Sequence, residues 1–328
     1  MNPRVRATAY ALSVIVIAVF SFNGCDGSGK VGGSSDAPIQ FAYQNRIGSA
    51  ACIVAVEKGF LQEAGLNVEA FRFNSGPACA EALYSGSADI GAMGDTTALI
   101  ASSRGAPLTI IGSHGAGEHR HRLVTMPDNG VSRPADLAGR RVAVKKGTST
   151  YGGYLAWLKK NGVDPSEVDT MNMRPSEMPD ALAAGSIDAF VASEPTPSLA
   201  EARGAEEVAT MGGLGNEYPI FLLAKQSLLA HRPDEMRRFL RAIQRAERFI
   251  AERPEETARL LARITGLDAE VSRRAMQRHR YALRLDEAIR RSLRDTAEFL
   301  VSEGIIDSPP DLEEALDDAF LPADGSPQ

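Results

Sequence analysis

Hydrophobic residues along this chain occur alternately as short continuous runs and at a spacing of three or four residues. This pattern indicates strands that alternate with helices. Short apolar runs predict strands at 39–43, 67–73, 88–93, 108–111 and 220–224. Apolar residues spaced three or four apart predict helices at 49–60, 77–84 and 96–103, and again at 236–250 and 293–301. Strands and helices in alternation are typical of an α/β fold, and the C-terminal third is predicted to be mainly helical.

Two parts of the chain repeat the same pattern at a fixed offset. The registered pairs are Gly48 and Gly147, Leu83 and Leu182, Gly86 and Gly185, Ser87 and Ser186, Asp89 and Asp188, and Asp95 and Glu194. In each copy the last carboxylate follows a short strand, so it is expected at the C-terminal end of that strand, where open α/β sheets bind ligands. We therefore predict two lobes with a cleft between them.

The predicted lobe boundaries follow from this repeat and from the strand at 220–224. Lobe 1 is assigned to 38–114 and 215–328, and lobe 2 to 115–214. The chain would cross between the lobes near 112–122 and near 210–220. Two crossings of this kind form a hinge about which the lobes can close.

The first residues are typical of an export signal. Arg4 and Arg6 precede a ten-residue apolar segment at 11–20, which is too short for a membrane-spanning helix. We assign 1–24 to a signal peptide and 25–37 to a flexible Gly/Ser tether. Phe22-Asn23-Gly24-Cys25 resembles a bacterial lipobox, although Asn23 departs from the usual pattern. Cys25 is thus expected to carry a lipid that anchors the protein at the outer face of the cytoplasmic membrane or in the periplasm; the alternative is a plain signal cut nearby.

Composition narrows the possible partners. The formal net charge is −6, so nucleic acid is not an expected partner. Three cysteines are too few for a disulfide scaffold or a four-cysteine zinc module. We expect a monomer with no cofactor and no bound metal.

Three stretches, 54–61, 76–95 and 136–150, resemble the substrate-binding proteins of ABC importers. The most similar subgroup is the one for nitrate, aliphatic sulfonates, taurine and thiamine-precursor pyrimidines. The resemblance implies a type II periplasmic-binding-protein fold, with two doubly wound lobes joined by a two-segment hinge. It also implies capture of a small molecule and its delivery to the transmembrane subunits of an ABC permease, without chemistry.

The resemblance also implies which residues contact the ligand. In lobe 1 these are Gln44, Arg46, Gly48, Ser49, Ser75, Gly76, Pro77, Asp95, Thr96 and Thr97. In lobe 2 they are Lys146, Gly147, Thr148, Ser149, Thr150, Glu194 and Pro195. Ser193-Glu194-Pro195 stands where sulfonate binders tend to have Trp-Asp-Pro, so the ligand itself is left open.

The same positions have a physical rationale of their own. Helix N-termini present unpaired N–H groups and a partial positive charge, which suits an anion, and Arg46 adds a guanidinium. Asp95 and Glu194 would bind a positive or hydrogen-bond-donating end, which favours an anion or zwitterion of the sulfonate or taurine type. The alternative is that the hydroxyls and carboxylates only cap helices.

Two further features keep alternatives open. The segment 112–122 carries His114, Glu118, His119 and His121, which would form a metal site, a solvated hinge, or a cationic wall of the cleft. Cys52 and Cys79 are candidates for a disulfide, since both lie in the first turns of predicted helices; the alternative is two buried apolar residues.

Rival functions were weighed on the same residues. An enzyme of this fold that makes the thiamine pyrimidine depends on a cysteine-rich motif, and the sequence contains no such run. A ligand sensor for a membrane receptor has the same sequence features as an importer component. Import of a small organic anion or zwitterion is the favoured function.

Overall fold

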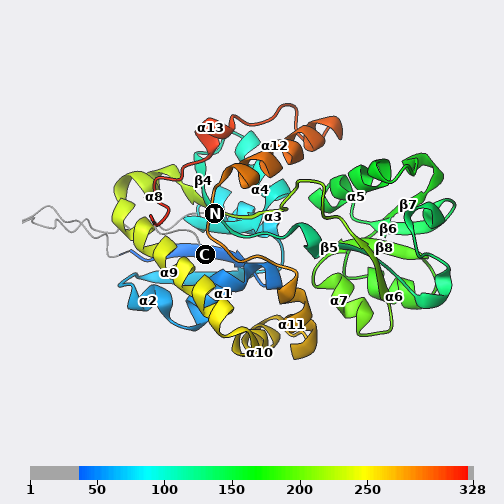
Figure 1. The fold of residues 1–328 in the computed structure, drawn as a ribbon. Helices are drawn as coiled ribbons and strands as arrows, with labels where there is room; N and C mark the ends of the chain where they lie inside the picture. The colour runs from blue at the N-terminus through cyan, green and yellow to red at the C-terminus, as the bar shows by residue number, and fades with distance from the viewer. Residues whose placement is uncertain (1–36, 324–328) are drawn as a thin grey trace, which may run out of the picture. The chain divides into compact units, whose positions relative to one another are not determined.

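A computed structural model of the chain describes residues 37–323 (Figure 1). The signal peptide predicted for 1–24, the lipidation site Cys25 and the tether up to residue 36 lie outside the described residues. None of the helices within 37–323 combines the length and the apolar character that crossing a membrane requires.

The first sheet has the strand order β2-β1-β3-β10-β4. Its strands are β1 (Ile39–Gln44), β2 (Val68–Phe73), β3 (Ile90–Gly94), β4 (Leu108–Gly115) and β10 (Ile220–Lys225). The first three are parallel, while β10 runs antiparallel to both β3 and β4. The helices that connect the three parallel strands account for the predicted alternation, and β10 is inserted between β3 and β4.

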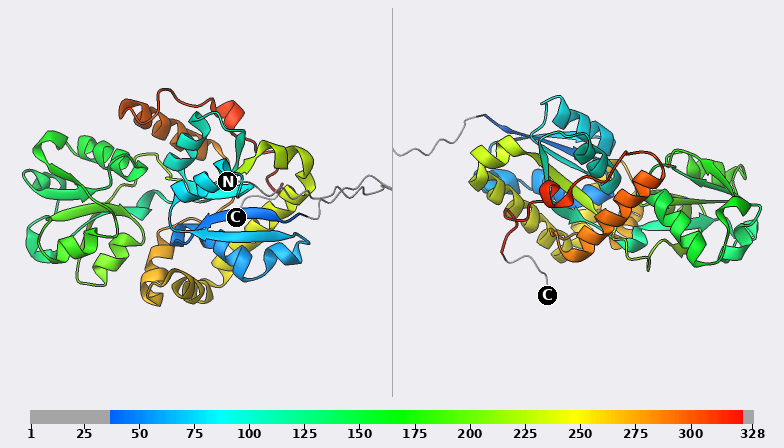
Figure 2. Two further views of the ribbon diagram at one scale, coloured as in Figure 1. Left: turned by 180° about the vertical axis from the view of Figure 1, so that it is seen from behind. Right: turned by 90° about the horizontal axis from the view of Figure 1, so that it is seen from above.

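Helices cover both faces of this sheet (Figures 1 and 2). One face packs against α1 (Ala50–Glu57), α2 (Phe60–Glu63), α8 (Gln226–His231), α9 (Pro233–Glu252), α10 (Pro254–Thr265) and α11 (Ala269–Gln277). The other packs against α3 (Gly76–Tyr84), α4 (Asp95–Ser103), α12 (Glu287–Ser302) and α13 (Leu312–Ala315). The helix predicted at 49–60 is divided, because Gly59 adopts a left-handed φ of 72° between α1 and α2.

The second sheet has the order β7-β6-β8-β5-β9. Its strands are β5 (His121–Thr125), β6 (Arg141–Val144), β7 (Asp169–Asn172), β8 (Ala189–Ser193) and β9 (Glu206–Thr210). α5 (Ser149–Lys160) packs on one face, and α6 (Met178–Ala183) and α7 (Thr196–Glu201) pack on the other. Short 3-10 turns lie at η1 (Ile47–Ser49), η2 (Glu118–Arg120), η3 (Pro127–Asn129), η4 (Pro134–Leu137) and η5 (Pro165–Glu167).

The repeat in the sequence is a repeat in topology. In each sheet the fourth strand, β10 or β5, arrives from the other sheet and runs antiparallel to its neighbours. The chain passes from β4 to β5 through 116–120 and returns from β9 to β10 through 211–219. The α/β fold class is therefore confirmed, while the exact lobe boundaries remain a prediction.

The expected disulfide is absent, because Cys52 and Cys79 are both free and buried. β2 and β3 lie on opposite sides of β1, so right-handed crossovers place α1 and α3 on opposite faces of the sheet. Cys52 accordingly packs in the core beneath α1, and Cys79 packs in the core beneath α3. Both helices begin at the same edge of the sheet, but the two thiols are buried in different cores.

Candidate functional site

The predicted ligand contacts lie at the C-terminal ends of the parallel strands, as the repeat implies. Several of their hydroxyls are used locally. Ser75 Oγ accepts from the Ala78 N–H, and Thr148 Oγ1 accepts from the Tyr151 N–H. These two side chains are N-caps of α3 and α5, so they satisfy their own helix termini and are less available to a ligand.

Thr96 and Ser149 bring the two halves of the structure into contact. The Ser149 N–H, at the start of α5, donates to Thr96 Oγ1 at the start of α4 over 3.0 Å. On the same side α12 packs against α5, with the Tyr151 and Phe299 rings 6.1 Å apart. The N-termini of α4 and α5 therefore meet directly, which brings together predicted residues from both lobes.

Asp95 is buried where these termini meet, with 3% of its surface exposed. Its carboxylate accepts from the Thr96 N–H at 2.7 Å and from Thr296 Oγ1 at 3.4 Å. Burial raises the pKa of Asp95, and the positive charge of Arg120 partly offsets that rise. Asp95 is thus placed at the junction as predicted, but its oxygens already have donors.

Arg120 and His121 enter this junction from the first crossing. Arg120, 8% exposed, donates from Nε and Nη2 to the Tyr218 carbonyl at 3.2 and 2.8 Å. His121, 1% exposed, stacks on the Tyr218 ring with centroids 4.1 Å apart. Neither ring nitrogen of His121 has a hydrogen-bond partner within the described residues. A buried imidazole in which both the donor and the acceptor nitrogen lack a partner is unusual in a protein interior.

Tyr218 holds this arrangement in place from the second crossing. It is a non-glycine residue with a positive φ, 45°. The Asn216 side chain accepts from the Tyr218 N–H at 2.7 Å, and the Tyr218 hydroxyl donates to the Met211 carbonyl. A left-handed tyrosine costs about 1–2 kcal/mol, and such strain is concentrated where surrounding contacts over-determine a functional geometry.

His279 reaches the same junction from far along the sequence. The segment after α11 turns back beside β4, where Arg280 and Ala116 exchange two backbone hydrogen bonds of 2.7 and 2.9 Å. Burial, together with the positive charges of Arg120 and Arg46, lowers the pKa of His279 to about 3. His279 Nε2 is buried and has no partner in the described part of the chain.

Arg46 completes the set from the loop after β1. Its side chain is exposed and makes no hydrogen bond or ion pair with any residue of 37–323. Its charge nevertheless lowers the pKa of Arg120, His121 and His279. We call these residues the junction cluster: Arg46, Asp95, Arg120, His121, Tyr218 and His279. Because burial keeps both imidazoles neutral, the cluster has two cations and one carboxylate, and this favours an anion.

Glu194 does not face this cluster as a free carboxylate, which corrects its expected role. Arg122 Nη1 donates to Glu194 Oε1 at 2.7 Å, and the same guanidinium pairs with Glu201 and Glu207. Two arginines of the first-sheet half reach these carboxylates, with Arg278 2.9 Å from Glu207 and Arg274 3.9 Å from Glu201. Glu194 is therefore part of a buried ion-pair network.

The histidines of the first crossing do not converge on one point. His114 lies inside the first core, with its ring nitrogens 3.7 and 3.8 Å from Cys52 Sγ. His119 is exposed and contacts Thr210 and Glu118. Within residues 37–323 no group of three or more His, Cys, Asp or Glu side chains is placed to hold a metal ion. Of these residues and their neighbours, Arg120 supplies the positive charge at the junction, and the buried His121 beside it is neutral.

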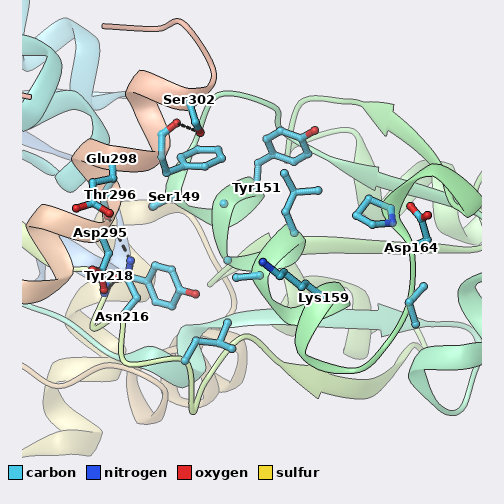
Figure 3. A pocket seen from close by; sticks show the side chains of 18 of the residues that line it. Ser149, Tyr151, Lys159, Asp164, Asn216, Tyr218, Asp295, Thr296, Glu298 and Ser302 are labelled. Atoms are coloured by element: carbon cyan, nitrogen blue, oxygen red, sulfur yellow. Dashed lines mark hydrogen bonds between the residues drawn. The ribbon is translucent and has the colours of Figure 1, made fainter. Parts of the chain in front are cut away.

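A pocket of about 1,100 Å³ borders the junction between α5 and α12. Figure 3 shows Tyr151 and Lys159 on the α5 side, and Asp295, Thr296 and Glu298 on the α12 side. Ser149, Tyr218 and Thr296 line it and also border Asp95. The pocket thus approaches the junction cluster from one side.

Among the predicted contacts, Arg46, Gly48, Asp95, Thr96 and Ser149 are those that the structure brings to the junction. Gly48 packs closely there, since a Cβ on it would lie 3.4 Å from His279 Nε2. Gly76 and Thr97 lie beside each other, and no hydrogen bond or ion pair within residues 37–323 joins Lys146, Gly147, Thr150 or Pro195 to the cluster. His279 was not predicted, because its approach depends on pairing with β4 across most of the chain.

Comparison with known proteins gives the family. A family model described as NMT1/THI5 like matches residues 47–257, more than half of the chain. The chain belongs to the NMT1/THI5-like family. It is 25% identical over 317 residues to a Bacillus subtilis (strain 168) protein that is named for binding aliphatic sulfonates, with 94% of this chain and 95% of the other covered.

Solved structures confirm the fold of this NMT1/THI5-like chain. The periplasmic aliphatic sulphonate binding protein SsuA from Escherichia coli aligns with a TM-score of 0.80 at 21% identity, over 90% of this chain and 96% of that one. The chain has the type II periplasmic-binding-protein fold. The same fold occurs in the desulfurization enzyme DSZB, with a TM-score of 0.70 at 18% identity, over 86% of this chain and 97% of that one.

Proposed function

We propose that this protein is the extracytoplasmic binding component of an ABC importer for a small organic anion of the sulfonate class. The observation that carries the proposal is the excess of positive charge in the junction cluster, where Arg46 and Arg120 are opposed by Asp95 alone. Relatives named for sulfonate binding support the ligand class. Delivery to the transmembrane subunits of a permease follows from the same likeness.

The ligand would be captured without chemical change. A fold shared with an enzyme does not by itself decide this. Burial raises the pKa of the Cys52 and Cys79 thiols, so both lack the thiolate character of a nucleophile. The guanidinium groups of Arg46 and Arg120 in the junction cluster are donors that suit the holding of an anion. Binding and release therefore account for the site.

Anchoring through Cys25 completes the proposal. A lipid on Cys25 and the Gly/Ser-rich residues that follow it would keep the binding domain near the permease. Labelled palmitate should enter the wild-type protein in its native host, and the variant Cys25→Ser should remain unlabelled. Equal labelling of both proteins, or labelling of neither, contradicts the anchor.

Ligand class is tested on the purified protein that begins after Cys25. Ethanesulfonate, taurine, nitrate, acetate and a hydroxymethylpyrimidine are screened by thermal unfolding, and every hit is titrated by calorimetry. A sulfonate should raise the unfolding temperature and bind at one site per chain. Stabilisation by nitrate, acetate or the hydroxymethylpyrimidine, without stabilisation by either sulfonate, would contradict the proposal.

A further inference from the structure

His279 has a defined tautomer. Its Nδ1 lies 2.8 Å from the Ala275 carbonyl oxygen, which can only accept a hydrogen bond. The proton of the neutral ring must therefore be on Nδ1. His279 Nε2 is then a lone-pair acceptor, and it is buried without a donor.

The position of this acceptor relates it to the junction cluster. Nε2 lies against Gly48, on the loop that carries Arg46, at 3.4 Å from the place where a Cβ would stand. The ring lies parallel to Tyr281 with centroids 5.6 Å apart, and the Tyr281 hydroxyl is tied to the Ile47 carbonyl at 2.9 Å. The Ala275 hydrogen bond and the packing against Tyr281 therefore fix the orientation of the imidazole, and with it the direction of the Nε2 lone pair.

Asp95 is the one carboxylate of the junction cluster, and it already accepts from Thr96 and Thr296. Glu194 has its charge balanced by Arg122. The positive charges of Arg46 and Arg120 both act on His279. An ammonium group beside His279 would therefore add a third cation to a cluster that has a single carboxylate.

We infer that the site selects an organic anion that also carries a neutral hydrogen-bond donor, such as a hydroxyl group, which His279 Nε2 accepts. This inference rests on the proposed function, since it assigns the second group of the ligand whose anionic end the cations hold. A hydroxyl satisfies the buried acceptor without adding charge. A methyl group leaves it unsatisfied, and an ammonium group adds a third cation.

Three sulfonates of nearly equal size separate these cases. Isethionate, ethanesulfonate and taurine differ only at the second carbon, which carries a hydroxyl, a hydrogen or an ammonium group. By calorimetry on the wild-type protein, isethionate should bind roughly three- to ten-fold more tightly than the other two, the usual worth of one neutral hydrogen bond. Equal affinities, or tightest binding of taurine, would overturn the inference while leaving the proposed function intact. If none of the three binds, the proposed function itself fails.

The variant His279→Phe assigns the preference to this residue. Phenylalanine keeps an aromatic ring beside Tyr281 but has no acceptor, so the variant should no longer prefer isethionate over ethanesulfonate. Its affinity for isethionate should fall to within roughly two-fold of the affinity that the wild type has for ethanesulfonate. The matched control is His231→Phe, because His231 is exposed on α8 and contacts the Ser227 carbonyl; it should keep the full preference. A preference that persists in His279→Phe contradicts the role of Nε2.

Discussion

Arg120 and Arg122 stand two positions apart on the first crossing, and both are almost completely buried. Their surroundings differ in charge. Arg122 pairs with Glu194, Glu201 and Glu207. Arg120 donates to a backbone carbonyl and has Asp95 as the main opposing charge. The positive charge of Arg122 is thus balanced by three carboxylates, whereas that of Arg120 is opposed mainly by one.

The difference separates a structural role from a binding role. A buried cation with three carboxylates has its charge balanced by the protein, and a ligand adds nothing to it. A buried cation opposed by one carboxylate is less fully compensated, so it can gain from an anion placed beside it. On this basis Arg122 has a structural role in the second sheet, and we propose a binding role for Arg120.

The largest expected effect is on the stability side of this comparison. Arg122→Ala leaves three carboxylates without their shared cation, so the free energy of unfolding should fall by about 3–5 kcal/mol. Urea denaturation measures it. Arg133→Ala is the control, because the exposed Arg133–Asp136 pair should contribute less than about 1 kcal/mol. A loss below about 1 kcal/mol for Arg122→Ala would mean that the network is not structural.

Arg120→Gln should affect both binding and stability. Loss of a charged hydrogen bond should weaken sulfonate binding by about 1.5–3 kcal/mol, and Asp95 would become a buried carboxylate without a cation. Adding Asp95→Asn in the double variant should restore the unfolding free energy but not the affinity. Calorimetry and urea denaturation report the two quantities separately. If affinity returns with stability, Arg120 acts only on folding.

Arg46→Ala should change binding alone. Arg46 is an exposed residue with no side-chain hydrogen bond or ion pair within residues 37–323, so its replacement should alter the unfolding free energy by less than about 0.5 kcal/mol. If it contacts the anion, affinity should fall by about 1.5–3 kcal/mol in calorimetry. Unchanged affinity would remove Arg46 from the binding site and leave Arg120 as its cation.

Glu247 extends the comparison to a buried acid with no ion-pair partner. Burial raises its pKa to about 8, and Oε1 has no donor within the described residues. The folded protein therefore keeps a proton that the unfolded chain releases near pH 4.3, and stability is lost as the pH rises from there to about 8. Glu247→Gln should remove that loss, so its unfolding free energy in urea should fall less than that of the wild type between pH 5 and pH 8.5. Parallel pH profiles for the two proteins would contradict the assignment.

Much of the fold was predictable because it depends on local patterns. Apolar runs located all the parallel strands of the first sheet, and the repeat led to two sheets of related topology. Of the two alternatives for Cys52 and Cys79, the disulfide is the one that the structure contradicts, for a topological reason. Which face a helix covers depends on whether the next strand lies to one side of β1 or the other, and this information is not in the spacing of residues along the chain.

The site was predictable only where a strand leads directly into a helix. Asp95, Thr96 and Ser149 lie at such ends, and the structure brings them together. Glu194 also lies at a strand end, but its partner Arg122 comes from a neighbouring strand. Side-chain directions at Arg120 and His121 depend on the 3-10 turn at Glu118–Arg120, which breaks the simple alternation of an extended segment.

The return of the chain beside β4 has a consequence for how these proteins diverge. His279 is brought to the junction by the backbone pairing of Arg280 with Ala116. Because that pairing is made by the backbone, it does not require a particular side chain at position 279. Under the proposed function, a substitution there would change the chemistry offered to a ligand while the fold is kept, so related binding proteins would differ in nutrient preference without differing in architecture.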